Sequence, residues 1–136
     1  MNENEALLRR WFEEVWNQGR TDTIDELYAE DCVAHGLGDS AEPIVGVAAF
    51  KTFHQAFHGA FPDITVTVED TVCEGDKIAA RCSVRGKHTG DTLGFAATNE
   101  PTEFTGIVIV RVKDGKFVEG WNSFDFMTMH KQLKTI

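Results

Sequence analysis

The sequence is poor in the features that mark several large protein classes. Its three cysteines, Cys32, Cys73 and Cys82, have no Cys-x-x-Cys spacing, so we expect reduced thiols rather than a disulfide framework or a zinc site. No apolar run approaches the roughly 20 residues that span a bilayer. Residues 1–10 are polar and acidic, unlike a signal peptide. Together these absences predict a cytoplasmic protein.

Basic residues are also scarce. The chain has 13 Lys and Arg residues against 22 Asp and Glu residues, which gives a formal net charge of −9. Proteins that bind nucleic acids gain most of their affinity from clustered Lys and Arg side chains, so this charge argues against such a partner. A neutral small molecule fits better. The length of 136 residues, with 42% apolar content, predicts one domain over residues 1–136.

The first half of the chain has helical periodicity. Apolar residues recur at helical spacing over residues 4–19, and Gly19 stands where a left-handed residue would end the helix. A shorter helix is predicted over residues 20–31, with Thr23 and Glu26 spaced as in a capping box. The apolar edge of this second helix consists of Ile24, Leu27 and Tyr28. A third helix is predicted over residues 47–61, and Pro62 ends it.

Beyond Pro62 the period changes from helical to twofold. Alternating or strongly apolar stretches predict four strands, at residues 63–72, 78–88, 103–112 and 117–126. Helices followed by strands, without a repeat or a linker, indicate an α+β fold.

The last predicted strand contains one acid in apolar surroundings. By parity Phe117, Trp121 and Asp125 share one face, but periodicity alone does not say which face looks inward. A buried carboxyl would have a raised pKa and would suit general acid/base catalysis. Alternatively, Asp125 caps a helix that begins near Met127.

Four segments carry a resemblance to a known family: "RRWFEEVWNQGRTDTIDELYAEDCVAHG", "GVAAFKTFHQAFHGAFPDITVTVED", "GKHTGDTLGF" and "VKDGKFVEGWNSFDFMTMHKQL". Together they resemble the SnoaL-like polyketide cyclases of the nuclear-transport-factor-like superfamily. The resemblance implies a cone in which a curved antiparallel sheet wraps around three helices, with a short C-terminal helix and a deep pocket. It also implies ring closure by intramolecular aldol condensation, without a metal or an organic cofactor.

The resemblance also implies functional residues. Asp125 matches the family's acid/base, and His88, in "GKHTG", matches a Gly-x-His-x-Gly stretch that leads into a lid-like loop. Either His88 orients the substrate or Asp125, or it is a strand-end histidine bonded to the backbone. The sequence departs from the family at Val108, where relatives carry a histidine on the third long strand.

Four further residues are predicted to line the substrate pocket: His35, Trp121, His54 and Phe104. His54 and His58 have the i, i+4 spacing that metal sites use. Since no third ligand accompanies them, a core histidine and a solvated histidine are the preferred interpretation, and no metal site is predicted.

Three functions remain open at this point. The first is a cofactor-free cyclase that acts on a hydrophobic carbonyl compound. The second is a non-catalytic protein that binds an apolar metabolite, and the third is an isomerase or hydrolase of the same superfamily. A homodimer or higher homo-oligomer is also predicted, because Thr105, Ile107 and Ile109 would give the convex face of the sheet an apolar character.

Overall fold

The computed structural model describes residues 2–38 and 41–136. The helices and strands of these residues are, in chain order, α1 (Glu3–Trp11), η1 (Phe12–Asn17), α2 (Thr21–Leu27), β1 (Tyr28–His35), β2 (Ile44–Val45), α3 (Val47–Ala60), β3 (Thr65–Glu74), β4 (Lys77–Lys87), β5 (Pro101–Lys113), β6 (Lys116–Phe124) and α4 (Phe126–Leu133).

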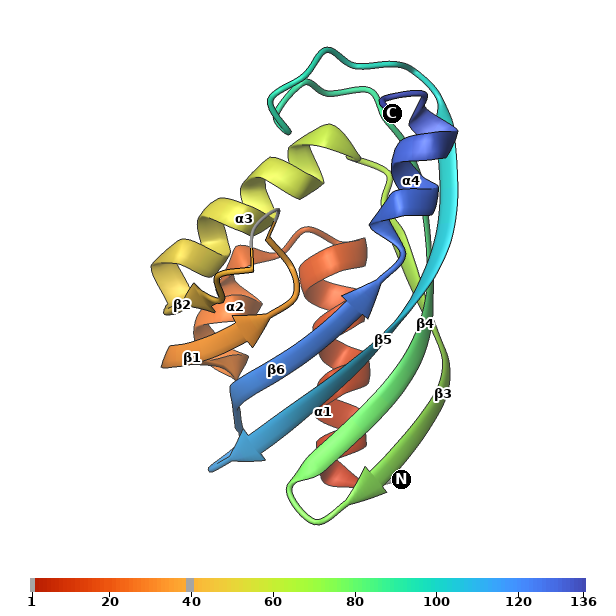
Figure 1. The fold of residues 1–136 in the computed structure, drawn as a ribbon. Coiled ribbons are helices and arrows are strands. Elements are labelled where there is room, and N and C mark those ends of the chain that lie inside the picture. The colour runs from red at the N-terminus through yellow and green to blue at the C-terminus, as the bar shows by residue number, and fades with distance from the viewer. Residues whose placement is uncertain (1, 39–40) are drawn as a thin grey trace.

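The strands form one curved sheet in the order β2-β1-β6-β5-β4-β3 (Figure 1). Strand β1 runs parallel to β6, and all the other neighbours are antiparallel. Helices α1, α2 and α3 lie on one side of the sheet, and α4 packs on β5 near the end of the molecule where the chain links β4 to β5. The predicted α+β fold, with a curved sheet and a short C-terminal helix, is confirmed.

The first helix follows its apolar pattern. Leu8 and Trp11 are buried on one side of α1, and the Asn2 side chain caps the helix by accepting a hydrogen bond from the Asn4 amide at 2.8 Å. The helix then widens into the π-helical segment η1. Gly19, with φ of +71°, follows in the left-handed conformation, so the predicted stop is confirmed.

The second predicted helix is wrong in its cap and at its end. The Thr23 hydroxyl donates to Glu14 at 2.7 Å instead of capping α2, and Arg20 holds the N-cap position without a side-chain bond. The helix stops at Leu27, and Tyr28 begins β1. Pairing of Tyr28 with Phe117 on β6 is a long-range contact, and it overrides the local helical pattern.

Strand β5 shows the twofold pattern most clearly. Its even-numbered residues from Thr102 to Val112 are buried, and most of the odd-numbered ones are exposed. Ile107 and Ile109 are therefore large apolar residues on the convex face, exposed by 50% and 39%. The predicted dimer stays a prediction, and sedimentation at micromolar concentration tests it.

A bulge in β6 breaks the parity that the sequence suggested. Phe117 pairs with Val112 and Glu119 pairs with Arg111, so Val118 is an extra residue in the ladder. After this bulge Gly120, Asn122 and Phe124 face inward with the even-numbered residues of β5. Trp121 and Ser123 consequently face outward, and Phe117 no longer shares a face with Trp121.

All three cysteines are free, and Cys32 and Cys82 are buried. In the part of the chain that the structure describes, no helix is both long enough and apolar enough to cross a membrane.

Candidate active site

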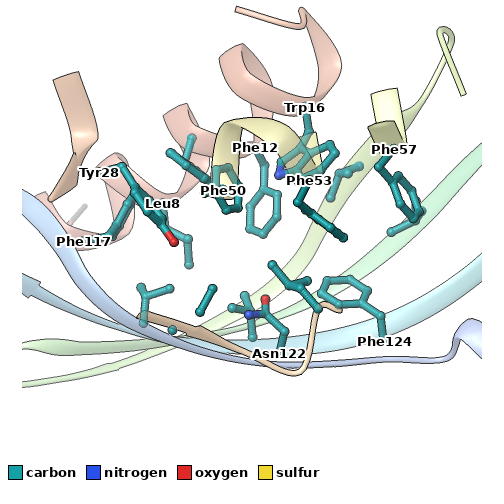
Figure 2. Close-up of a pocket in the computed structure, with 18 of the residues that line it drawn as sticks. Leu8, Phe12, Trp16, Tyr28, Phe50, Phe53, Phe57, Phe117, Asn122 and Phe124 are labelled. Atoms are coloured by element: carbon teal, nitrogen blue, oxygen red, sulfur yellow. The ribbon is translucent and has the colours of Figure 1, made fainter. Parts of the chain in front are cut away.

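A cavity lies between the helices and the inner face of the sheet (Figure 2). Helical residues such as Phe12, Phe50 and Phe53 form one wall, and Phe104 and Val108 belong to the sheet side. About 90 Å³ of its interior admits the centre of a water-sized molecule, several times the roughly 10–15 Å³ that one water needs. An apolar, aromatic hollow of this kind is typical of small-molecule sites.

Tyr28 lines the cavity and carries a buried hydroxyl group. Its ring stacks on Trp11, with centroids 5.5 Å apart, and on Phe50 at 4.7 Å, so the side chain is held from both sides. The hydroxyl oxygen is inaccessible and has no hydrogen bond of ordinary geometry, and its neighbour is the Cys32 thiol, whose sulfur is a weak acceptor. Burial raises the pKa of Tyr28 well above its ordinary value, which keeps the hydroxyl protonated and able to donate.

Asn122 contributes an amide to the same cavity (Figure 2). Its Nδ2 donates to the carbonyl oxygen of His35 at 3.0 Å, which fixes the orientation of the amide. Since the amide nitrogen is used in this way, Oδ1 is the atom left to accept a hydrogen bond from a ligand.

Cys32 also lines the cavity. Burial raises the pKa of its thiol to about 11, so the thiol stays protonated near neutral pH and is a poor nucleophile.

Glu119 is the acidic residue among the described residues that line the cavity. It lies beside the bulge, and its carboxylate is bonded to His35 Nε2 at 2.8 Å and to Arg111 Nη1 at 3.4 Å. His35 and Arg111 both pack on the ring of Trp121, with distances of 5.8 Å and 5.5 Å to its centroid. The carboxylate therefore belongs to a polar cluster on the convex face, next to Gly120, which faces the cavity.

Asp125 lies outside the cavity, exposed at the start of α4. Its carboxylate accepts hydrogen bonds from the Thr128 hydroxyl at 2.6 Å and from the Thr128 amide at 3.0 Å. These two bonds hold the pKa of Asp125 below its ordinary value. The expected burial and raised pKa are therefore wrong, and the alternative of a helix cap is confirmed.

His88 is completely buried, yet it does not line the cavity. Its Nδ1 accepts a hydrogen bond from the Thr98 amide at 3.1 Å, so the ring proton resides on Nε2, which has no partner. Phe61 and Phe95 pack against the ring at 5.4 Å and 5.1 Å between centroids. Burial, and then the nearby His130, lower the pKa of His88. Of its two interpretations, the backbone-bonded histidine matches these contacts.

His54 is a core residue. Its Nε2 donates to the carbonyl oxygen of Val15 at 2.7 Å, and its ring lies 4.8 Å from that of Trp16. Burial lowers its pKa. The rings of His54 and His58 are 5.5 Å apart, and among the described residues no group of three or more potential metal ligands includes them.

The structure separates the six predicted site residues. Phe104 lines the cavity. Those that do not line it are Asp125, His88, His35, Trp121 and His54. His35 and Trp121 lie together on the convex face, stacked on each other. Any role of these residues in binding or catalysis stays a prediction.

Sequence reasoning missed Tyr28 and Asn122. Tyr28, the one tyrosine of the chain, was not predicted to line the cavity because its segment has a helical pattern. Asn122 was hidden because the bulge at Val118 reverses the parity of β6.

Comparison with known proteins assigns the fold. The family model of the SnoaL-like polyketide cyclases matches residues 6–133. The chain belongs to this family. The crystal structure of IdmH from Streptomyces antibioticus is 34% identical in sequence to this SnoaL-like protein, with a TM-score of 0.84, over 98% of this chain and 99% of that one.

More distant relatives cover most of the chain as well. Aklanonic acid methyl ester cyclase DauD from Streptomyces sp. (strain C5) is 26% identical over 128 residues, which are 93% of this chain and 79% of that protein. A SnoaL-like structure from Jannaschia sp. CCS1 has a TM-score of 0.88 at 19% identity, covering 98% of this chain and 93% of that one. The latter similarity concerns the fold alone.

Proposed function

We propose that this SnoaL-like protein closes a ring in a hydrophobic carbonyl compound by a cofactor-independent, aldol-type reaction inside the cavity. The observation that carries the proposal is the combination of aromatic walls with two hydrogen-bonding groups, the Tyr28 hydroxyl and Asn122 Oδ1. Membership of a family of cyclases, and the similarity to a methyl ester cyclase, support it.

The reaction needs few groups from the protein. A base removes a proton from a carbon next to a carbonyl, the resulting carbanion attacks a second carbonyl carbon, and the new alkoxide takes up a proton. Holding both ends of the substrate in contact replaces a bimolecular encounter, and the rigid aromatic walls suit that task. Acid/base assistance of this kind typically contributes about 10² to 10⁴ in rate.

We assign the proton transfer to Glu119, in place of the Asp125 that the resemblance implied. Glu119 lies at the edge of the cavity, and its carboxylate, bonded to His35 at 2.8 Å on the convex face, would have to turn inward to reach a substrate, whereas Asp125 is exposed and accepts hydrogen bonds from Thr128. The protonated Tyr28 hydroxyl would polarise a carbonyl oxygen of the substrate.

A second function, binding without turnover, is favoured by one specific observation. Both oxygens of the Glu119 carboxylate are engaged, one by His35 and the other by Arg111. A carboxylate whose two oxygens are both engaged in this way leaves no oxygen free to take a proton from a substrate. In that case the cavity would hold an apolar metabolite unchanged.

A panel of aromatic polyketide-like diketones separates these functions. Binding is followed by thermal shift, and conversion by chromatography with mass spectrometry. The cyclase proposal predicts a product of unchanged mass or one water lighter. It also predicts that Glu119→Gln abolishes conversion, whereas the matched carboxylate variant Asp125→Asn retains it. Loss of conversion in Asp125→Asn alone would return the role to Asp125, and binding without any product would support the second function.

A further inference from the structure

The Tyr28 hydroxyl has no hydrogen bond of ordinary geometry within the protein, and its neighbour, the Cys32 thiol, is only a weak acceptor. We propose that it recognises the ligand by donating a hydrogen bond to a carbonyl oxygen, which makes the cavity selective for aromatic ketones over hydrocarbons of the same shape. The inference rests on the proposed function in one respect, namely that the cavity is the ligand site.

Among the described residues, four buried side-chain nitrogen or oxygen atoms have no hydrogen-bond partner: Tyr28 Oη, His54 Nδ1, His58 Nε2 and His88 Nε2. Only the tyrosine among these four residues lines the cavity. A buried hydroxyl without a partner lowers stability, because it has lost its bonds to water and gained none in return. A ligand that supplied an acceptor would restore that bond.

The position of the hydroxyl is fixed by its surroundings. The Tyr28 ring is stacked between Trp11 and Phe50, with interplanar angles of 16° and 30°, and the residue is only 5% exposed. Figure 2 shows the side chain extending beside Leu8 toward the space between the helices and the sheet. Because the ring is already immobilised, a ligand that bonds to the hydroxyl incurs little further loss of side-chain entropy.

The chemistry of the lining defines the class of ligand. Burial holds the pKa of Tyr28 above its ordinary value, so the hydroxyl is a donor that seeks a neutral or anionic oxygen. Asn122 presents an acceptor, since its Nδ2 is bonded to the His35 carbonyl. The remaining walls are aromatic and aliphatic. A flat aromatic compound with a carbonyl group satisfies these surfaces.

The test uses two probes of nearly the same shape, 9-fluorenone and fluorene, which differ by one carbonyl oxygen. Their affinities for the full-length protein are measured by quenching of tryptophan fluorescence, because Trp11 and Trp16 line the cavity. In Tyr28→Phe we expect the affinity for fluorenone to fall roughly 3- to 10-fold, as for loss of one neutral hydrogen bond, while the affinity for fluorene is unchanged. The melting temperature without ligand should be maintained or raised, since an unpaired buried hydroxyl has been removed.

Phe117→Leu is the matched control. Phe117 pairs with Tyr28 across the parallel strands and lines the same end of the cavity, but has no polar atom. This variant should weaken both probes by the same factor. Equal effects of Tyr28→Phe on fluorenone and fluorene would overturn the inference and leave the proposed function standing. If neither probe binds the wild-type protein, both the proposed site and the inference fail.

Discussion

Two regions of this protein are both buried and aromatic, but they differ in what surrounds their unpaired polar atoms. The first is the cavity, whose lining includes Tyr28, a residue with a buried hydroxyl that has no hydrogen bond of ordinary geometry. The second, which we call the closed corner, consists of His88, Phe61, Phe95 and Thr98. There, His88 Nε2 lacks a partner as well.

The closed corner is tied down by its backbone. The amide of His88 bonds to the Glu100 carbonyl at 3.0 Å, the Asn99 amide bonds to the His88 carbonyl at 2.8 Å, and the Gly90 amide bonds to the Ala60 carbonyl at 3.2 Å. The contrast teaches that a buried unpaired atom indicates a binding site only when space for a ligand lies next to it. We therefore expect His88 to hold residues 88–100 in place and Tyr28 to contact a ligand.

Glycine substitutions should give the largest difference between the two regions. A Cβ on Gly90 would lie 2.0 Å from the backbone oxygen of Gly59, whereas a Cβ on Gly120 in the cavity wall would meet nothing closer than 3.7 Å. We expect Gly90→Ala to lower the free energy of unfolding by about 3 kcal/mol or more, and Gly120→Ala to change it by less than about 1 kcal/mol. Urea unfolding measures both, and equal losses would contradict the contrast.

Removal of the His88 ring should cost stability and leave binding intact. His88→Leu keeps the volume but leaves the Thr98 amide without its acceptor, for which we expect a loss of about 1–3 kcal/mol in urea unfolding. His88→Asn, which can present an acceptor oxygen near the position of Nδ1, should recover part of that loss. The affinity for fluorenone should stay at the wild-type value in both variants. A large loss of affinity in His88→Asn would move His88 into the site.

Acid should destabilise the protein through His88 and His54. The pKa of His88 is lowered in the folded state by burial and by His130 on α4, and the pKa of His54 is lowered by burial. Below the unfolded value of about 6.5, the unfolded chain therefore binds more protons, and stability falls as the pH drops toward the lowered folded values. The urea midpoint should decrease between pH 7.5 and about 5.5, and less so in His88→Leu. The same slope in both proteins would exclude His88 as a source.

The smallest effect is expected at Asp125. Because its carboxylate caps α4 through Thr128, Asp125→Ala should lower the melting temperature by a few degrees at neutral pH. The pKa of Asp125 is lowered in the folded state, so the stabilisation is present above the unfolded value and disappears in strong acid as the carboxylate becomes protonated. Asp125→Asn, which can still cap a helix, serves as the control. A wild-type melting temperature in Asp125→Ala would refute the capping role.

Much of the fold could be predicted because its local patterns and its tertiary contacts agree. The apolar residues of α3 recur with a helical period, and those of β5 alternate as in a strand. The helix also ends just before Pro62, as its sequence indicates. The helix predicted at Tyr28 is wrong because this residue pairs with Phe117, which lies on a strand almost 90 residues away. Local sequence contains no sign of that pairing.

The candidate site was harder to predict for a related reason. One extra residue, Val118, reverses the faces of β6, so that Asn122 enters the cavity and Trp121 leaves it. Asp125 was expected inside because its neighbours in sequence are apolar. In three dimensions it is the first residue beyond β6 and faces solvent at the helix start. The local sequence was therefore enough to predict the family, but it did not predict where individual polar side chains lie.

The most direct test of the cavity as the ligand site is to fill it. Gly120 and Val110 lie opposite each other on the inner face, so a leucine at position 120 would project into the hollow. The measurement is the affinity of 9-fluorenone for Gly120→Leu, compared with Ile109→Leu on the convex face. We predict that Gly120→Leu weakens binding roughly tenfold or more at a near-normal melting temperature, and that Ile109→Leu changes neither. Wild-type affinity in a folded Gly120→Leu protein would contradict the account.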